Sequence, residues 1–390
     1  MSDQRAPSIA VLSCNGGTQT IGEEAATRLL VATLNGVYVL DRADADSPWT
    51  TTSKVLEDLH IACILYEPRS GKIFAGAHWN KGLFVSDDSG VTFQPCMNGI
   101  ARSHLYTLAI QYRGDETVLF AGTEPSALYR SDDVGASWYD LPGIWEVPET
   151  DQWKFPPPPH IAHVKQVAWH PSNLKKLYVC IEQGALLISD DDGQTWSENR
   201  AYADPEKDMF RHDNHRVLFR DDAACYFMCG GEGIHYTDDD GETWVQLMSR
   251  DSRIGYPDAM HIDPRDDSVI YVCGPKAGPG IWAKFGTSNP TVMKSTDAGQ
   301  SWTEKRNGFP EDLVGNIEAS GLHHVGEAIT LFLGTASGEV WQSDDAAESW
   351  RLIADGLPSI AKNGHFRYLL PPEEKAAAED MMRKCGAEYA

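Results

Sequence analysis

Histidines are the residues of this chain whose type and spacing most directly indicate chemistry. Of the 13 histidines, four stand at the start of an apolar segment that recurs along the chain: His60, His104, His163 and His215. His365 precedes the similar segment Phe366–Leu370. Neutral imidazole is a common ligand of zinc, manganese, iron and copper. We therefore expect these five histidines to bind one divalent transition metal (Zn, Mn, Fe or Cu), provided that the fold brings their segments together.

Further titratable residues follow the next apolar segment of several units. They are His78, Glu124, Glu182 and Glu232. A carboxylate beside a metal-bound imidazole fixes the tautomer of the ring, and a carboxylate without that task can act as a general base. We expect these four residues to be catalytic. The structural alternative is that histidines copied by duplication of a unit only hydrogen-bond to neighbouring loops.

An internal repeat defines the elements that must position these residues. Six segments fit the pattern S/T-x-D-x-G-x-T/S-aromatic, except that Ala347 replaces the glycine of the last; they begin at Ser86, Ser131, Ser189, Thr237, Ser295 and Ser343. By subtraction, their starts are 45, 58, 48, 58 and 48 residues apart. Repeats of this length are typical of propeller blades. Ser or Thr and Asp can bind turn amides, and Gly permits a positive φ, so we interpret the six aspartates as structural.

The repeated segment resembles the Asp-box, or BNR, repeat over roughly residues 27–370. The resemblance implies an all-β protein, a seven-bladed β-propeller with Asp-box turns in six blades. The expected domain is 1–390, with blades at roughly 27–58, 59–102, 103–160, 161–210, 211–252, 253–314 and 315–360 and a short capping helix in the tail 371–390. The innermost strand of the first blade could be Phe366–Leu370 or Ile9–Cys14. The first is favoured, because it closes the ring with both chain ends.

Three long insertions fall on one face of such a propeller, opposite the Asp boxes. They are Asp140–Ala162, Arg200–Asn214 and Gly274–Val292. The histidines at the strand starts lie on the same face. Because long loops on a rigid scaffold commonly carry function, we expect the site at this mouth of the channel.

Composition excludes some classes of partner. The net charge of −24, from 33 basic and 57 acidic residues, disfavours binding to nucleic acids or membranes. The first residues lack the pattern of a secretion signal, and the eight cysteines include no C-x-x-C pair. We therefore expect a cytoplasmic protein.

The resemblance does not extend to sialidases, because an F/Y-R-I-P motif and a pattern of three arginines are missing from the sequence. Overall the chain is most similar to cytoplasmic bacterial BNR-repeat proteins that are loosely labelled glycosyl hydrolases. The function that we expect is a metal-dependent hydrolase or lyase acting on a small polar or aromatic molecule. One alternative is a non-catalytic scaffold that binds a protein partner. Another is a metal-dependent oxygenase with histidine-bound iron or copper.

Overall fold

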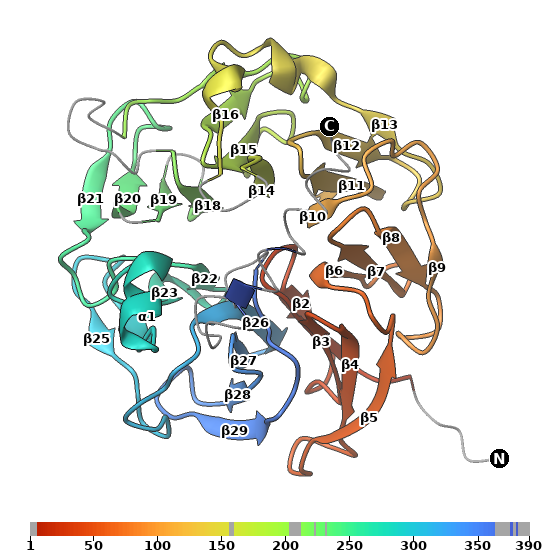
Figure 1. Ribbon diagram of the computed structural model, residues 1–390, viewed down its shortest axis with the longest axis vertical. Helices are drawn as coiled ribbons and strands as arrows, with labels where there is room; N and C mark the ends of the chain where they lie inside the picture. Colours follow the sequence, from red (N-terminus) through yellow and green to blue (C-terminus); the bar gives the residue numbers. More distant parts are fainter. Residues whose placement is uncertain are drawn as a thin grey trace.

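Short apolar strands and tight turns alternate along the chain, and they assemble into sheets arranged around a central channel (Figure 1). The structure is a computed structural model that describes residues 6–155, 160–202, 212–221, 224–230, 232–362, 375, 376 and 380. The described residues form seven sheets, six of four strands and one of five. The predicted seven-bladed β-propeller is confirmed.

The first four blades contain β1 (Ile9–Leu12), β3 (Arg28–Thr33), β4 (Gly36–Asp41) and β5 (Thr50–Val55); β6 (Ile61–Glu67), β7 (Lys72–Ala77), β8 (Gly82–Ser86) and β9 (Gln94–Pro95); β10 (Leu105–Arg113), β11 (Glu116–Thr123), β12 (Leu128–Ser131) and β13 (Tyr139–Asp140); and β14 (His163–Trp169), β15 (Leu177–Glu182), β16 (Leu186–Ser189) and β17 (Ser197–Glu198). The last three contain β18 (Asn214–Phe219), β19 (Cys225–Cys229), β20 (Gly233–Thr237) and β21 (Val245–Met248); β22 (Ala259–Asp263), β23 (Asp266–Gly274), β24 (Thr291–Ser295) and β25 (Thr303–Glu304); and β2 (Gln19–Ile21), β26 (Ile317–Val325), β27 (Ala328–Thr335), β28 (Val340–Ser343) and β29 (Arg351–Ala354).

The Asp box forms a turn that its own side chains hold together. In the box of the fourth blade, Ser189 Oγ accepts a hydrogen bond from the amide of Gly193 at 2.9 Å. Asp191 accepts hydrogen bonds from the amide of Thr195 at 2.8 Å and from its hydroxyl at 2.6 Å. Gly193 has a φ of +88°, which glycine adopts readily. These contacts support a structural role for the Asp-box aspartates.

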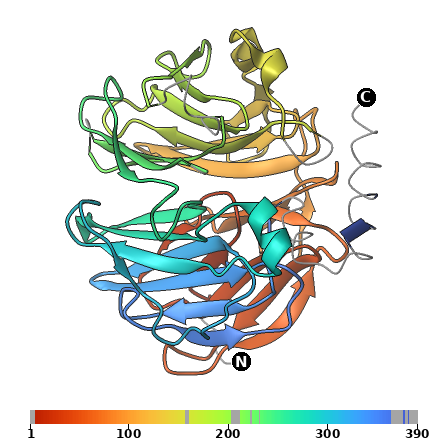
Figure 2. The same ribbon diagram turned by 60° about the vertical axis from the view of Figure 1, so that its left-hand side comes forward.

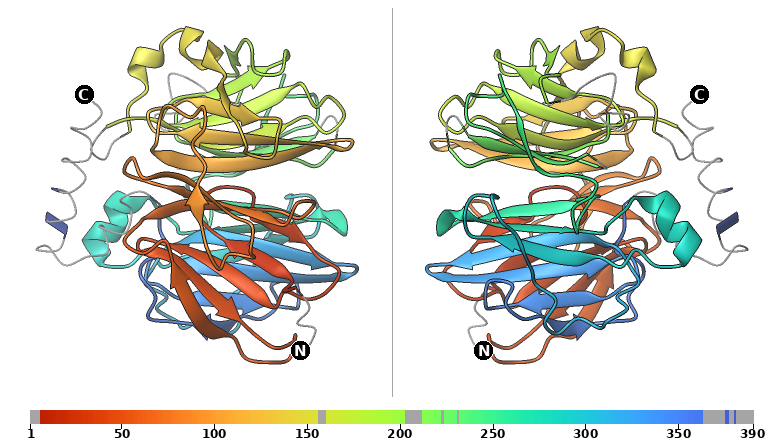
Figure 3. Two further views of the ribbon diagram at one scale, coloured as in Figure 1. Left: turned by 90° about the vertical axis from the view of Figure 1, so that its right-hand side faces the viewer. Right: turned by 90° about the vertical axis from the view of Figure 1, so that its left-hand side faces the viewer.

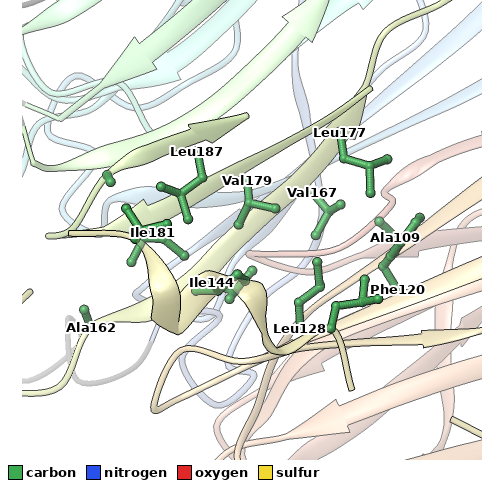
Figure 4. Close-up of a cluster of buried hydrophobic side chains, with 14 of the residues drawn as sticks. Ala109, Phe120, Leu128, Ile144, Ala162, Val167, Leu177, Val179, Ile181 and Leu187 are labelled. Carbon is green, nitrogen blue, oxygen red and sulfur yellow. The ribbon is translucent and has the colours of Figure 1, made fainter. Parts of the chain in front are cut away.

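Blades also pack against the Asp box of the next blade. The amide of Trp138 donates to Asn98 O at 2.8 Å, and the amide of Trp350 donates to Asn307 O at the same distance. Apolar side chains fill the space between blades. Figure 4 shows such a cluster between the third and fourth blades, to which the short helix η1 (Pro142–Glu146) adds Ile144.

The N-terminal segment runs through the channel and joins both ends of the ring. β1 pairs in parallel with β3, and β2 pairs in parallel with β26. β1, with the sequence IAVL, is completely buried. It occupies the innermost position of the first blade, so the segment Ile9–Cys14 supplies this strand, and not the C-terminal segment that the sequence favoured. Phe366–Leu370 and most of the tail 371–390, including the predicted capping helix, lie outside the described residues.

The helical insertions project from one face of the propeller. Figures 2 and 3 show η1, η2 (Thr150–Gln152) and α1 (Pro279–Phe285) on the same side. They belong to loops before an innermost strand or between the second and third strands of a blade, opposite the Asp boxes. We call this side the loop face. Within the described part of the chain, no helix is long and apolar enough to cross a membrane.

The Asp boxes make the stability of the fold sensitive to acid. Hydrogen bonds from Thr195 lower the pKa of Asp191 to about 2, and hydrogen bonds from Thr243 lower the pKa of Asp239 to about 2. The unfolded value is about 3.9. This stabilisation is therefore complete above about pH 4 and is lost as the pH falls towards 2. We expect the thermal midpoint, measured by circular dichroism, to fall across this window. The fall should be smaller in the double variant Asp191→Asn, Asp239→Asn; an equal fall would contradict the assignment.

Candidate functional site

The start of each innermost strand determines which side chains enter the channel. Five of these strands have a β-bulge near their start, and the bulged residues are Ala62, Tyr106, Lys165, His215 and Glu318. The residue just before the bulged strand accepts, through its carbonyl, a hydrogen bond from a backbone amide of the loop after the second strand of the blade. The amide of His78 donates to His60 O, that of Glu124 to His104 O and that of Gly230 to Asp213 O. Asp213 therefore occupies in the fifth blade the place of His60 and His104. His215, at the bulge, is the counterpart of Tyr106 and Lys165.

Imidazoles and carboxylates of four consecutive blades form one continuous series of contacts around the channel. The rings of His60 and His78 lie 4.4 Å apart, and His78 Nδ1 lies 2.6 Å from His104 Nε2. His104 Nδ1 is 3.5 Å from Glu124 Oε1. All four side chains are buried. Burial lowers the pKa of His60 to about 3 and the pKa of His104 to about 4, the latter despite Glu124, so both imidazoles are neutral at pH 7.

His163 continues the series between two carboxylates. Its Nδ1 lies 3.1 Å from Glu124 Oε2, and its Nε2 lies 2.8 Å from Glu182 Oε2. The Tyr106 ring stacks on the imidazole with centroids 3.6 Å apart. Burial lowers the pKa of His163, but the hydrogen bonds to Glu124 and Glu182 outweigh that effect and raise it. Each ring nitrogen therefore lies within hydrogen-bond distance of a carboxylate oxygen.

Glu182, Asp213 and His215 form the group best suited to a metal. One ligand atom of each lies within 4.8 Å of the others, and all three are buried. His215 Nε2 is 3.4 Å from Asp213 Oδ1 and 3.5 Å from Glu182 Oε1. His215 Nδ1 lies 2.8 Å from Pro257 O. A carbonyl only accepts, so Nδ1 carries a proton and Nε2 is the nitrogen that faces the carboxylates.

A glycine leaves room beside these groups. Gly230 occupies the loop position that Glu124 and Glu182 occupy in the preceding blades. A Cβ at residue 230 would lie 2.3 Å from Asp213 Oδ2 and 2.7 Å from His215 Nε2. The absence of a side chain at this position is therefore required by the approach of Asp213 and His215.

Two buried lysines complete the charge distribution. Lys165 Nζ lies 2.9 Å from Glu182 Oε2, and Lys362 forms an ion pair with Asp258. Asp258 also accepts a hydrogen bond from Asn316 Nδ2 at 2.6 Å. Burial raises the pKa of Glu182, but the nearby Lys165, Lys362 and the two histidines hold it well below its usual value. The cluster therefore contains ionised groups of both signs, which offset one another's desolvation.

Most of the residues predicted from the sequence meet in this cluster. His60, His78, His104, Glu124, His163, Glu182 and His215 belong to it. The histidines lie along an arc with carboxylates between them. The contacts do not bring the four imidazoles of His60, His104, His163 and His215 together around one point, as a shared metal would require. Glu232 lies elsewhere and pairs with Arg250 at 2.6 Å. His365 lies outside the described residues.

Sequence reasoning missed Asp213, Asp258, Lys165 and Lys362. Asp213 was missed because His215, two residues later, is a histidine like the residues at this position in the other blades. The strand register shows that Asp213, and not His215, occupies that position, and the bulge that shifts His215 is not visible in a sequence. Glu232 was misplaced for the same reason, since Gly230 is the equivalent position.

Comparison with known proteins agrees with the repeat and the fold. The family model for the BNR/Asp-box repeat matches residues 187–198, the box of the fourth blade. No curated protein matches the chain. A solved structure described as YCF48 bound to D1 peptide is 16% identical, with a TM-score of 0.55 over 90% of this chain and 95% of the other. The WD40 propeller domain of Doa1 is 10% identical, with a TM-score of 0.54 over 87% and 94%.

An enzyme from Niastella koreensis, of the GH74 class, is 15% identical, with a TM-score of 0.59. The match covers 90% of this chain but 55% of that enzyme, so the chain spans about half of the enzyme's length. At these identities the likeness concerns the fold alone. Propellers of this shape include enzymes and proteins without catalysis.

Proposed function

We propose that this seven-bladed propeller with Asp-box repeats is a metal-dependent enzyme, a hydrolase or lyase, that holds one divalent transition metal between Glu182, Asp213 and His215. The observation that carries the proposal is the state of His215. Its Nδ1 proton is committed to Pro257 O, while the buried Nε2 and Glu182 Oε1 lack a hydrogen-bond partner among the described residues. A metal between them would satisfy both atoms.

The spacing of the three side chains supports this assignment. Two ligands about 2.1 Å from a tetrahedral metal are about 3.4 Å apart. His215 Nε2 lies 3.4 Å from Asp213 and 3.5 Å from Glu182. Burial alone would lower the pKa of His215, but Asp213 and Glu182 raise it to about 9. The two carboxylates therefore stabilise a positive charge at His215 Nε2, which a proton supplies when no metal is bound.

The donor set favours hydrolytic or lyase chemistry over oxygen chemistry. One imidazole with two carboxylates suits manganese or zinc better than copper. Such a metal supplies a Lewis acid and an activated water. Glu182 Oε2 lies 2.8 Å from His163 Nε2 and 2.9 Å from Lys165 Nζ, and these contacts fix the orientation of the carboxylate. Glu124 holds the far side of His163, so His163 is the residue placed to move a proton near the metal.

The first prediction concerns metal content. Protein purified without chelators is expected to contain close to one equivalent of manganese or zinc per chain. Inductively coupled plasma mass spectrometry measures this directly. Removal with EDTA should lower the thermal midpoint, and adding the same metal back should restore it, because the ion neutralises two buried carboxylates. Less than about 0.1 equivalent, with no change in midpoint on adding Mn²⁺ or Zn²⁺, would contradict the proposal.

A protein-binding scaffold is the second candidate, and one observation favours it. Three large apolar side chains on the loop face are exposed: Trp145, Ile281 and Phe285, with exposed fractions of 43%, 48% and 65%. Exposed aromatic side chains on projecting helices are typical of partner contacts. If this is the function, a partner protein should copurify in stoichiometric amount and stay bound when EDTA removes metal. It should no longer copurify with the variant in which Trp145, Ile281 and Phe285 are all replaced by serine. A partner that the triple serine variant retains would contradict the scaffold function at this surface.

A further inference from the structure

The channel contains a cavity away from the proposed metal ligands. A cavity of about 410 Å³ lies among the innermost strands β10, β14, β18 and β22 and the axial segment 16–19. Its lining reaches Trp169, Pro171 and Phe219, near the turns that end those strands, on the side of the Asp boxes. Glu182, Asp213 and His215 do not belong to its lining. The volume falls in the range of about 300–1,000 Å³ that small-molecule sites occupy.

Arg216 brings a positive charge to this cavity. It is one of the lining residues and is only 9% exposed. Its Nε donates to Asp258 O at 3.2 Å, and its Nη2 donates to Cys14 O of the axial segment at 3.0 Å. Both acceptors are neutral carbonyls. A guanidinium has five N–H groups, so these two bonds leave donors available.

The charge of Arg216 is not paired directly by the described residues. Several other arginines of the propeller contact carboxylates, as Arg113 does with Asp192 at 2.5 Å. Asp258 attracts Arg216 through space, but its carboxylate binds Asn316 and Lys362. Among the residues that the structure describes, Arg216 forms no ion pair. A buried cation without a contacting anion is costly unless a ligand supplies one.

Much of the remaining lining is apolar or already hydrogen-bonded. Ile110, Trp169, Phe219 and Met260 contribute apolar surface. Gln166 exchanges hydrogen bonds with the backbone of Val217 at 3.0 and 2.6 Å. His261 contacts Ser320 Oγ at 2.8 Å, and burial keeps it neutral. The cavity thus combines one cation that has no direct ion pair among the described residues with apolar and aromatic walls.

We propose that this cavity binds a small monocarboxylate with an aromatic or aliphatic body, whose carboxylate pairs with Arg216 and whose body packs against Trp169 and Phe219. Arginine recognises a carboxylate with two parallel N–H donors, which gives charge and geometry together. The site is separate from the proposed metal ligands and does not depend on a bound metal.

Phenylacetate and its neutral amide, phenylacetamide, test the role of the charge. Titration calorimetry on the full chain in EDTA should show the acid binding at least about 10-fold more tightly than the amide, because only the acid pairs with Arg216. The variant Arg216→Met should lower acid binding to the level of the amide. Arg253→Met, which removes an arginine paired with Glu304 on the surface, should leave both affinities unchanged. Equal affinities of acid and amide in the wild type would overturn the proposal.

A second variant tests the location without touching the charge. Ile110 lies in the lining, and its Cγ2 is 4.0 Å from the position that a Cβ on Gly17 of the axial segment would take. Ile110→Trp should fill the space and abolish binding of both probes, while the thermal midpoint confirms that the chain is folded. This variant decides the matter if Arg216→Met fails to fold after losing its bond to Cys14. Unchanged phenylacetate binding by Ile110→Trp would place the ligand elsewhere and refute the proposal.

Discussion

The variant Asp213→Asn is expected to bind Mn²⁺ and Zn²⁺ more than about 100-fold more weakly than the wild type. The substitution keeps the size of the side chain and one oxygen, but it removes one of the two anionic ligands beside His215 Nε2. Competition against a fluorescent chelator measures the affinity. Because Asp213 is buried next to a histidine, we also expect the metal-free variant to show a lower pKa for His215 by NMR titration.

Two further variants separate ligand loss from general damage. Glu232→Gln changes a carboxylate of the same blade that pairs with Arg250, and it should leave metal affinity unchanged. Gly230→Ala keeps all three ligands but places a methyl group 2.3 Å from Asp213 Oδ2 and 2.7 Å from His215 Nε2, so it should also weaken binding. If Asp213→Asn and Gly230→Ala both bind metal as the wild type does, the assignment of the three ligands is wrong.

The second large effect is expected at the contact between the last two blades. Gly308→Ala should lower the free energy of unfolding by more than about 3 kcal/mol. Gly308 has a φ of +97°, and a Cβ there would lie 1.9 Å from the carbonyl oxygen of Trp350. That carbonyl belongs to the residue whose amide bonds to Asn307, so it cannot retreat without breaking the contact between the blades. Urea unfolding followed by tryptophan fluorescence measures the loss.

A matched glycine provides the control. Gly326 also has a positive φ, +54°, but a Cβ there would meet nothing within 4 Å. Gly326→Ala carries only the conformational cost, which is about 1–2 kcal/mol for a left-handed residue. A loss at Gly308 no greater than the loss at Gly326 would show that the blades adjust freely at this contact.

The fold was largely predictable because its signals are local and repeated. Each Asp box carries its own hydrogen bonds, as between Asp191 and Thr195, and six copies reinforce one interpretation. The innermost strand of the first blade was not predictable in this way. Ile9–Leu12 and Phe366–Leu370 are both short and apolar, and only the pairing of β1 with β3 distinguishes them.

The candidate site was predictable in its location and less so in its ligands. Residue type and position relative to the strands led to His60, His104 and His163, which share one place in their blades. His215 matched them by type but sits on a bulge, and the residue in their place is Asp213. Lys362 could not be found from local patterns, because it reaches Asp258 from 104 positions along the chain.

The axial segment also has a consequence for how the chain is made. Gln19 pairs with Leu322, so the partner of β2 is synthesised 303 residues later, by subtraction. Early blades can form while translation continues, but the ring cannot close until the seventh blade exists. Contacts so distant in sequence slow folding, and the open intermediate exposes strand edges at both ends of the ring. The first strands to leave the ribosome are thus among the last to find all their neighbours.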